Sequence, residues 1–486
     1  MRCLPLEREK SFALMAFLTL LGLLLRLAFL DHRSLYSDET WSFSAASMGP
    51  LGLLSPVASY DLHPPLYYMV LSAFLALGKS EFAIRFPSAI FGTLTIPLAH
   101  WLGRRFLGER GGLLVSFLLA ISPMHVRYSQ EARMYSLMAL FATLSLILLL
   151  RAMDRGGAAS WSLYGISAAL CLYTHYIAFF FLLSESVLVL WISLRRGSFG
   201  ILKDFMLSGI CALAIFSPWI HYALILQVHN TLLAKRSLLM DLIRMPLHFS
   251  YFFPITRIED FVSLVPMTIT LVMYVSSLGL CGLLALFGLL RAKEDWLKIV
   301  VCWIFIPPIA ALLVLYAIIR VWPWRSVYYL FELPIFLGLV ASGLLELGSK
   351  RKALASILLV FLTASYGFAN AVNYQTEAED WRAAAAFVEA NAIPGDAIAF
   401  DRPFTDGPFN YYAKGAVPHR LKFDRVSAEY GGYDRVWLVV AHYGDPEESG
   451  LKRFLDGHCE RSGVWRFAGL NTDIWVYLYI PGSRAR

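Results

Sequence analysis

Charged side chains are scarce in this chain of 486 residues. Asp, Glu, Lys and Arg make up 16% of it, whereas a typical soluble domain contains about 25%. Hydrophobic residues make up 58% and aromatic residues 15%. So few polar groups cannot cover the core of a soluble protein of this length, and the composition also excludes a disordered, collagen-like or coiled-coil chain. We therefore expect a polytopic α-helical membrane protein.

Several other signals are missing. The chain has six cysteines, and four of them lie within apolar runs: Cys171, Cys211, Cys281 and Cys302. No CxxC pair or other metal-ligand spacing occurs, so the cysteines indicate no metal site. Basic residues are not clustered on a polar domain, which argues against binding to nucleic acid. No internal repeat or low-complexity linker interrupts the chain.

The charges are distributed unevenly. Residues 1–373 contain 29 Lys and Arg against 19 Asp and Glu, whereas residues 374–486 contain 13 against 16. Short basic loops alternate with loops that are less basic or hold acids and histidines, and the positive-inside rule places the basic loops and the N-terminus in the cytoplasm. Residues 374–486 then lie outside. Eleven apolar runs are expected to span the membrane: 11–30, 83–102, 111–122, 134–150, 160–173, 177–194, 201–226, 261–290, 297–319, 327–347 and 353–372.

Other segments do not fit a span. Residues 65–78 are apolar but too short to cross a bilayer, so we expect an interfacial helix on the outer face. Residues 227–260 have the pattern of an external amphipathic element. Residues 374–486 begin with an alanine-rich helix that stops at Pro-Gly-Asp and is followed by a strand, AIAF, and RVWLVV and IWVYLYI are two further predicted strands. We predict a transmembrane domain (1–373), with an external loop at 31–82, and a small extracytoplasmic α/β domain (374–486).

The first external loop carries two adjacent carboxylates, Asp38 and Glu39. Trp41 and Phe43 follow, which suggests an amphipathic helix lying on the membrane. Partial desolvation at the bilayer surface would make a carboxylate a better base toward a hydroxyl or an amine. The simpler interpretation is a pair of solvated loop acids.

Two later segments on the same side of the membrane carry further polar residues. Asp61 and His63 precede two prolines that lead into the apolar helix, and a plain Asp-His turn is the alternative. Glu131, Arg133 and Tyr135 lie between two predicted spans. The i, i+4 spacing of Glu131 and Tyr135 predicts that they share a helix face. Ionisable groups at a membrane boundary are costly to bury, which makes these residues functional candidates.

Four residues are weaker candidates. His175 and Tyr176 follow a predicted span, where a histidine at the membrane interface is the simpler interpretation. Arg320 and Arg325 lie among tryptophans that are ordinary membrane anchors. Two arginines on the external side run against the positive-inside bias, so we expect an anionic group beside them.

These segments, taken in order, resemble a known family. The acidic pair, HPPLYY, RFPSAIFGTLTIPLAHWLGRRFLGERGGLL and SPMHVRYSQEARMYSL together resemble the GT-C glycosyltransferases of the protein O-mannosyltransferase and aminoarabinose-transferase type. The resemblance covers the first part of the chain, up to about residue 200. It implies a GT-C fold and a membrane enzyme that takes a sugar from a polyprenyl-phosphate donor on the extracytoplasmic face.

The resemblance also implies roles for individual residues. The acid that lies at the reaction centre in this family maps onto Asp38, and Glu39 completes the pair. The chain has His63 where the aminoarabinose transferases carry a lysine. It has Glu131 one turn before a family acid that maps close to Tyr135. At both positions the chain departs from the family pattern, and both positions bear on the donor sugar and the phosphate contacts.

The residues fit the displacement of a lipid phosphate from an anomeric carbon. This reaction needs a base for the nucleophile and cations for the phosphate, but no acid for so good a leaving group. We expect Asp38 to be the base and Arg133, Arg320, Arg325 and His63 to hold phosphate. Direct displacement inverts the sugar carbon. The sequence requires no cofactor, and a divalent metal at Asp38 and Glu39 is left open.

Two other functions are weighed against this glycosyltransferase. A transporter or flippase of polyprenyl-linked saccharides would concentrate polar groups at the midplane and often contains repeats, which the sequence lacks. A non-catalytic assembly component that binds a partner through residues 374–486 is the second alternative. For the enzyme, we expect a polyprenyl-phosphate-sugar donor, a lipid, protein or polysaccharide acceptor, and no nucleic acid. The compact loops and the resemblance predict a bacterial inner (plasma) membrane.

Overall fold

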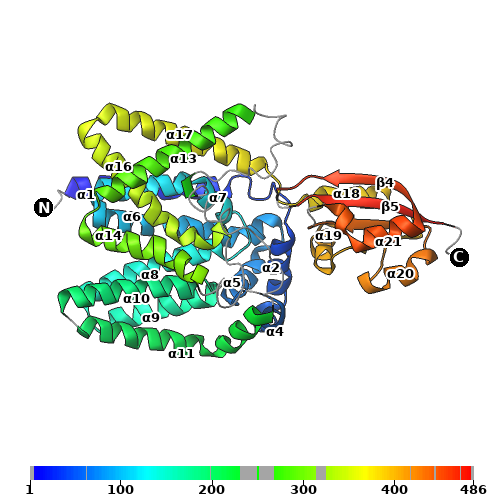
Figure 1. Ribbon diagram of the computed structural model, residues 1–486, viewed down its shortest axis with the longest axis horizontal. Coiled ribbons are helices and arrows are strands. Elements are labelled where there is room, and N and C mark those ends of the chain that lie inside the picture. The colour runs from blue at the N-terminus through cyan, green and yellow to red at the C-terminus, as the bar shows by residue number, and fades with distance from the viewer. Residues whose placement is uncertain are drawn as a thin grey trace. The chain divides into compact units, whose positions relative to one another are not determined.

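A computed structural model of the chain describes residues 5–61, 63–197, 199–229, 249–250, 267–313, 325–415, 418–442, 445–470 and 472–482. It divides into two compact units (Figure 1). As far as these residues are described, the first unit comprises Met1–Leu30, Ala45–Phe253 and Thr268–Asn373, and the second comprises Asp31–Ser44, Pro254–Met267 and Tyr374–Arg486. The sequence predicts that the whole loop 31–82 belongs to the transmembrane domain. Its first residues, 31–44, pack instead with the second unit.

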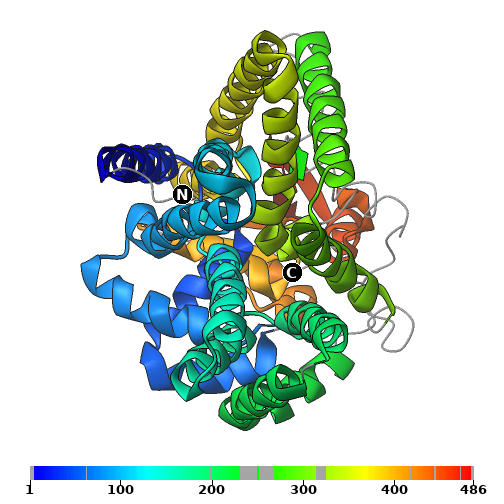
Figure 2. The ribbon, with the colours of Figure 1, turned by 90° about the vertical axis from the view of Figure 1, so that its left-hand side faces the viewer.

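The first unit is built from helices, which Figure 2 shows from one end. Their bounds are α1 Pro5–Leu27, α3 Gly49–Gly52, α4 Leu54–Tyr60, α5 Leu66–Phe74 with the 3₁₀ turn η1 Leu75–Leu77, α6 Glu81–Ile121, α7 Pro123–Ser129, α8 Tyr135–Arg155, α9 Ala158–Thr174, α10 Ala178–Arg196, α11 Phe199–His229, α13 Met267–Leu290, α14 Glu294–Val300, the π-helical turn η3 Val301–Phe305, α15 Ile306–Ala311, the 3₁₀ helix η5 Ser326–Glu332, α16 Leu333–Lys350 and α17 Lys352–Gln375. Helix α2, Ser37–Ser47, passes from the second unit into the first.

Within the described residues, eight helices are long and apolar enough to cross a membrane. They are α1, α6, α8, α10, α11, α13, the pair η5 and α16, and α17. The expected eleven spans are therefore not confirmed. Two differences have simple causes: α9 has 17 residues, and α6 contains two of the predicted spans. The predicted elements at 227–260 and 297–319 lie largely or partly outside the described residues.

Helix α6 changes direction at Gly108, where φ is +77°. This left-handed conformation favours glycine, because a Cβ atom would be strained there. The two arms run back along each other, since Ser116 Oγ donates a hydrogen bond to the carbonyl oxygen of Ile96 at 3.5 Å. A Cβ on Gly112 would lie 2.7 Å from the carbonyl oxygen of His100. Small residues thus let the arms pack backbone to backbone, as in many membrane helix pairs.

Three short helices of the first unit, α4, α5 and α7, lie at one end of its bundle (Figure 1). Helix α5 and η1 together span Leu66–Leu77, so the expected short apolar helix is confirmed. Asp61 and His63 lie in the α4–α5 connection, residues 130–134 form the α7–α8 turn, and His175 lies between α9 and α10. These connections therefore carry several of the candidate side chains, while the long helices hold the connections in place.

The second unit contains a five-stranded sheet in the order β2-β1-β3-β5-β4. Strand β1 is parallel to β2 and β3, and β5 is antiparallel to β3 and β4. The predicted helix and the three predicted strands are confirmed as α18, β1, β3 and β5. The elements are α18 Trp381–Asn391, β1 Asp396–Phe400, η6 Pro403–Thr405, α19 Asp406–Tyr412, β2 His419–Arg420, η7 Phe423–Arg425, α20 Val426–Glu429, η8 Tyr430–Gly432, β3 Arg435–Val440, η9 Pro446–Glu448, α21 Gly450–His458, β4 Cys459–Phe467 and β5 Ile474–Pro481.

Both faces of this sheet are covered. On one face Trp381 and Val388 of α18 pack with Ile398 and Trp437. On the other face residues of α20 and α21, such as Leu455, pack with strand residues that point the opposite way. The strands β1 and β3 are nearly continuous apolar runs because helices cover both of their faces.

Candidate active site

Asp61 and His63 form a buried pair in the α4–α5 connection. The His63 backbone N–H donates to Asp61 Oδ1 at 3.0 Å, and His63 Nδ1 lies 2.9 Å from the same oxygen. Burial by itself raises the pKa of Asp61. The bond from His63, the nearby charge of Arg133 and the bond from Tyr68 outweigh burial and hold this pKa below its usual range. Asp61 is therefore an anion that orients the imidazole of His63.

Arg133 reaches this pair from the α7–α8 turn. Its Nη1 donates to the Tyr68 hydroxyl at 3.3 Å, and the same hydroxyl donates to Asp61 Oδ2 at 2.6 Å. Its Nη2 lies 3.3 Å from His63 Nδ1. Since the shorter bond of Nδ1 goes to a carboxylate, that nitrogen carries a proton directed at Asp61. Two segments distant in sequence thus bring one anion, one cation and an imidazole together.

His175 completes the cluster from the α9–α10 connection. Its ring centroid lies 5.0 Å from that of His63 and 4.8 Å from that of Tyr328. The backbone N–H of Ile177 donates to His175 Nδ1 at 3.0 Å, so the ring proton sits on Nε2. His175 Nε2 is buried and has no hydrogen-bond partner among the described residues. Burial, followed by the charges of His63 and Arg133, holds the pKa of His175 well below its usual value. This side chain is therefore a buried N–H donor without a partner among the described residues.

Tyrosine side chains line the same place. The ring centroid of Tyr135 lies 6.1 Å from that of Tyr328 and 6.5 Å from that of His175. The Tyr176 hydroxyl accepts a bond from Trp219 Nε1 at 3.0 Å, and burial raises the pKa of Tyr176 to about 12. Tyr135 and Tyr328 are therefore the tyrosines whose rings contact the histidine rings of the cluster.

The predicted relation between Glu131 and Tyr135 is wrong. Helix α8 begins at Tyr135, and Glu131 lies in the preceding turn, so the two residues do not share a helix face. Glu131 Oε1 accepts a bond from Arg127 Nε at 3.3 Å instead. Arg325 is exposed and lies close enough to Tyr128 to act on it electrostatically. The other predicted arginine, Arg320, lies outside the described residues.

The acidic pair lies in the first turn of α2. Glu39 is fully buried, and its Oε2 accepts a bond from the Tyr36 backbone N–H at 3.3 Å, as in a helix capping box. Asp38 is half-buried. The expected amphipathic helix is not found, because polar and apolar residues are not separated onto opposite faces of α2. The Phe43 ring packs edge to face on Tyr411 at 5.4 Å.

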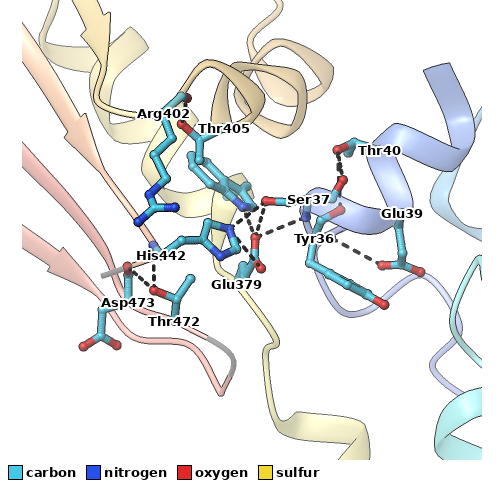
Figure 3. A network of polar contacts seen from close by, with 11 residues as sticks. Tyr36, Ser37, Glu39, Thr40, Glu379, Arg402, Thr405, His442, Thr472 and Asp473 are labelled. Carbon is cyan, nitrogen blue, oxygen red and sulfur yellow. Dashed lines mark hydrogen bonds and ion pairs between the residues drawn. The ribbon is translucent and has the colours of Figure 1, made fainter. Parts of the chain in front are cut away.

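A polar network in the second unit holds the residue before Asp38 (Figure 3). Glu379 Oε2 accepts bonds from the Ser37 backbone N–H at 3.1 Å, from Ser37 Oγ at 2.7 Å and from Trp381 Nε1 at 2.6 Å. His442 Nε2 lies 3.1 Å from Ser37 Oγ and 3.5 Å from Glu379 Oε1. In a nucleophilic triad the carboxylate binds the other imidazole nitrogen and the hydroxyl donates to the imidazole. Here the hydroxyl donates to the carboxylate, so the network has a structural role and is not a nucleophilic triad.

No group of three or more His, Cys, Asp or Glu side chains that could hold a metal ion is found among the described residues. The sequence missed several residues of both clusters, namely Tyr68, Tyr328, Ser37, Glu379 and His442. Tyr68 lies within the HPPLYY motif, so this motif could have identified it as a site residue. Glu379 and His442 carried none, because only the fold brings them to Ser37.

Comparisons with known proteins agree with this architecture. Residues 62–222 match the family model described as dolichyl-phosphate-mannose-protein mannosyltransferase, a range that contains His63, Arg133 and His175. No curated protein sequence matches the chain.

Among solved structures, apo ArnT from Cupriavidus metallidurans superposes with a TM-score of 0.56 at 12% identity, and the match covers 96% of this chain and 98% of ArnT. ArnT bound to undecaprenyl phosphate gives 0.55 at 13% identity, over 95% and 97% of the two chains. The oligosaccharyltransferase AglB from Archaeoglobus fulgidus, in complex with an inhibitory peptide and a dolichol-phosphate, gives 0.57 at 12%, over 99% and 75%. The chain is a multi-pass membrane protein with the fold of the GT-C glycosyltransferases, which confirms the resemblance at the level of fold.

Proposed function

We propose that this protein is a glycosyltransferase that moves a sugar from a polyprenyl-phosphate donor to a lipid, protein or polysaccharide acceptor. We place it in a bacterial inner membrane, with the N-terminus in the cytoplasm and residues 374–486 on the extracytoplasmic side. The support comes from the family match, from the fold, and from the undecaprenyl phosphate and dolichol-phosphate held by its structural neighbours.

One observation carries the proposal: the buried cluster around His63. Arg133 brings a planar cation, which suits phosphate oxygens. His175 brings a buried N–H that lacks a partner among the described residues. A buried donor of this kind costs free energy unless a ligand or a water satisfies it. A phosphate monoester or diester seated here would satisfy it and would share the charge of Arg133. Arg325 serves the same anion in this proposal.

An apolar pocket beside the cluster suits the isoprenoid chain of such a donor. It has a volume of 730 Å³, and Leu54, Pro65, Leu66, Met69, Leu170 and Trp219 are among its lining residues. Pro65 is two residues from His63, and Tyr173, which also lines the pocket, is two residues from His175. A lipid phosphate could therefore place its head at the cluster and its first isoprene units in the pocket. Burial of apolar chain contributes about 0.8 kcal/mol per methylene group.

Asp38 is the proposed base. It takes the proton of the acceptor hydroxyl or amine, the acceptor attacks the anomeric carbon, and the bond to the lipid phosphate breaks. Polyprenyl phosphate leaves with the electron pair and needs no proton at neutral pH. A direct displacement of this kind inverts the sugar carbon. The flippase alternative would leave the anomeric bond intact.

The test compares the wild type with Asp38→Asn in proteoliposomes that contain an envelope extract as acceptor. Undecaprenyl phosphate carrying labelled aminoarabinose or mannose is the donor probe. We expect release of undecaprenyl phosphate and transfer of label with the wild type, and a loss of at least about 100-fold in the variant, within the range of a removed general base. Near-normal transfer by the variant would contradict the assigned base. Movement of intact donor across the bilayer without label transfer would favour the flippase.

A further inference from the structure

We infer that the start of the second unit positions Asp38, and that Glu379 and Arg382 are the residues through which it does so. This inference rests on the proposed function, because it assigns Asp38 to the reaction. It gives residues 374–486 a role in the chemical step rather than in acceptor binding alone. Every contact in the argument lies within the second unit.

The residues just before Asp38 are held at their backbone. The Arg382 guanidinium donates to the carbonyl oxygens of His32 at 2.9 Å and Asp31 at 3.0 Å. The Arg382 backbone N–H donates to Ser34 Oγ at 3.1 Å. Two carbonyls and one hydroxyl of the loop are thus bound by a single residue. The planar guanidinium also lies 5.7 Å from the centroid of the Tyr412 ring, which limits its freedom.

The backbone N–H groups of the loop are bound by neighbours of Arg382. Ser34 N–H donates to Glu377 Oε2 at 2.8 Å, and Leu35 N–H donates to the Tyr412 hydroxyl at 2.6 Å. Ser37 N–H and Oγ both donate to Glu379 Oε2 (Figure 3). The loop has no regular secondary structure of its own at residues 33–36. Its conformation therefore depends on these acceptors, since backbone groups that leave water must find partners.

Glu379 is the most constrained of these residues. Its side chain is 1% exposed. Burial raises the pKa of this carboxyl, but bonds from His442, Trp381 and Ser37 outweigh burial and bring the pKa below its ordinary value. An anion with several donors around it has one favourable orientation. Ser37 is the first residue of α2, so fixing Ser37 also fixes the residue after it, Asp38.

A positioned base loses rate when it moves, even if the substrate still binds. A displacement of about 1 Å can cost about 100-fold in rate. We therefore expect Arg382→Ala and Glu379→Gln to lower kcat by about 10- to 100-fold. The concentration of undecaprenyl phosphate that half-protects the protein against thermal unfolding is expected to stay within about twofold of the wild type. A protein that is merely destabilised would instead lose activity and binding of undecaprenyl phosphate together, each in proportion to its unfolded fraction.

Two comparisons separate positioning from folding. Arg382→Lys keeps a cation but replaces the two-pronged guanidinium with one donor group, so we expect partial recovery of kcat relative to Arg382→Ala. Arg435→Ala removes a partly buried pair with Asp396, whose Oδ2 lies 2.6 Å from Arg435 Nη2, in the same unit. None of the described contacts of Arg435 reaches residues 31–44. We expect Arg435→Ala to lower the melting temperature and to leave kcat per folded molecule unchanged.

The outcomes are distinguishable. The inference is overturned if Asp38→Asn abolishes transfer while folded Arg382→Ala and Glu379→Gln keep kcat within about twofold of the wild type. If these variants do not fold, Ser37→Ala, which removes one hydroxyl, is measured against the same criterion with an expected loss of about threefold. If the wild type transfers no sugar from either donor and Asp38→Asn behaves identically, the proposed function fails and the inference about Asp38 fails with it.

Discussion

Replacing Asp61 by Asn is expected to lower the free energy of unfolding. At the same time, it is expected to increase the rise in thermal midpoint that a lipid phosphate causes. Asp61 accepts bonds from His63 N at 3.0 Å, His63 Nδ1 at 2.9 Å and the Tyr68 hydroxyl at 2.6 Å. Asparagine keeps the size and one acceptor oxygen. It removes the negative charge and puts an NH₂ donor where Tyr68 now donates.

The magnitude follows from these contacts. A hydrogen bond to a charged group contributes about 1.5–3 kcal/mol, and removing one partner of a buried charge pair costs about 3–5 kcal/mol. Because the amide oxygen of asparagine keeps part of the bonding to His63, we expect a loss of about 2–4 kcal/mol in the free energy of unfolding. The pKa of Asp61 lies below its usual value. Its contribution is therefore complete above an unfolded pKa of about 3.9 and is lost only as pH falls through the lower folded pKa. The difference between wild type and variant should stay constant from pH 8 to pH 5.

The stabilisation by a lipid phosphate is expected to increase in the variant, although its stability without ligand decreases. Without Asp61, the charge of Arg133 lacks its buried anion, so a bound phosphate removes a larger electrostatic cost in the variant. We expect undecaprenyl phosphate to raise the thermal midpoint of Asp61→Asn in detergent more than that of the wild type. Asp154→Asn is the control, because Asp154 forms a partly exposed pair with Arg105 at 2.6 Å, and such pairs contribute about 1 kcal/mol or less. A variant as stable as the wild type, or one that gains less from the lipid phosphate, would refute this reasoning.

Two further predictions concern the donor site. His175→Phe should weaken binding of undecaprenyl phosphate by about 10-fold or more, because the buried Nε2–H is lost, whereas His175→Gln, which keeps an N–H, should lose less; equal losses in a thermal-shift titration would contradict a donor role. Leu66→Trp should fill the apolar pocket and raise KM several-fold for an undecaprenyl donor. A farnesyl donor should be affected less, and an equal rise for both donors would place the lipid chain elsewhere.

The charged and imidazole side chains of the cluster around His63 lie in connections rather than in helices, and this placement has a physical reason. A polar group in the lipid-facing part of a helix is costly, whereas a connection at the end of a bundle can bury it among other polar groups. Asp61, Arg133 and His175 each come from such a connection. Each connection is short, so the helices on either side restrict its conformation. The site thus combines long helices that are nearly inert chemically with three short polar segments.

The sequence alone determined the class of the protein. The low share of charged residues and the length of the apolar runs predicted a membrane protein, because the bilayer requires about 20 consecutive apolar residues for each span. Periodicity and turn residues located α18, β1, β3 and β5, because local patterns govern helices and strands in a covered sheet. The order of the motifs was enough to predict a GT-C fold. The residues quoted from those motifs include His63 and Arg133.

Only the tertiary structure decided which candidates meet. Sequence spacing placed Glu131 with Tyr135, but the α7–α8 turn separates them and pairs Glu131 with Arg127. Spacing also assigned the acidic pair to the transmembrane part, whereas residues 31–44 pack with a sheet domain more than 300 positions later. The cause is the same in both cases. A hydrogen bond such as that from Ser37 to Glu379 joins residues distant in sequence, so it depends on the tertiary fold and cannot be predicted from a local sequence pattern.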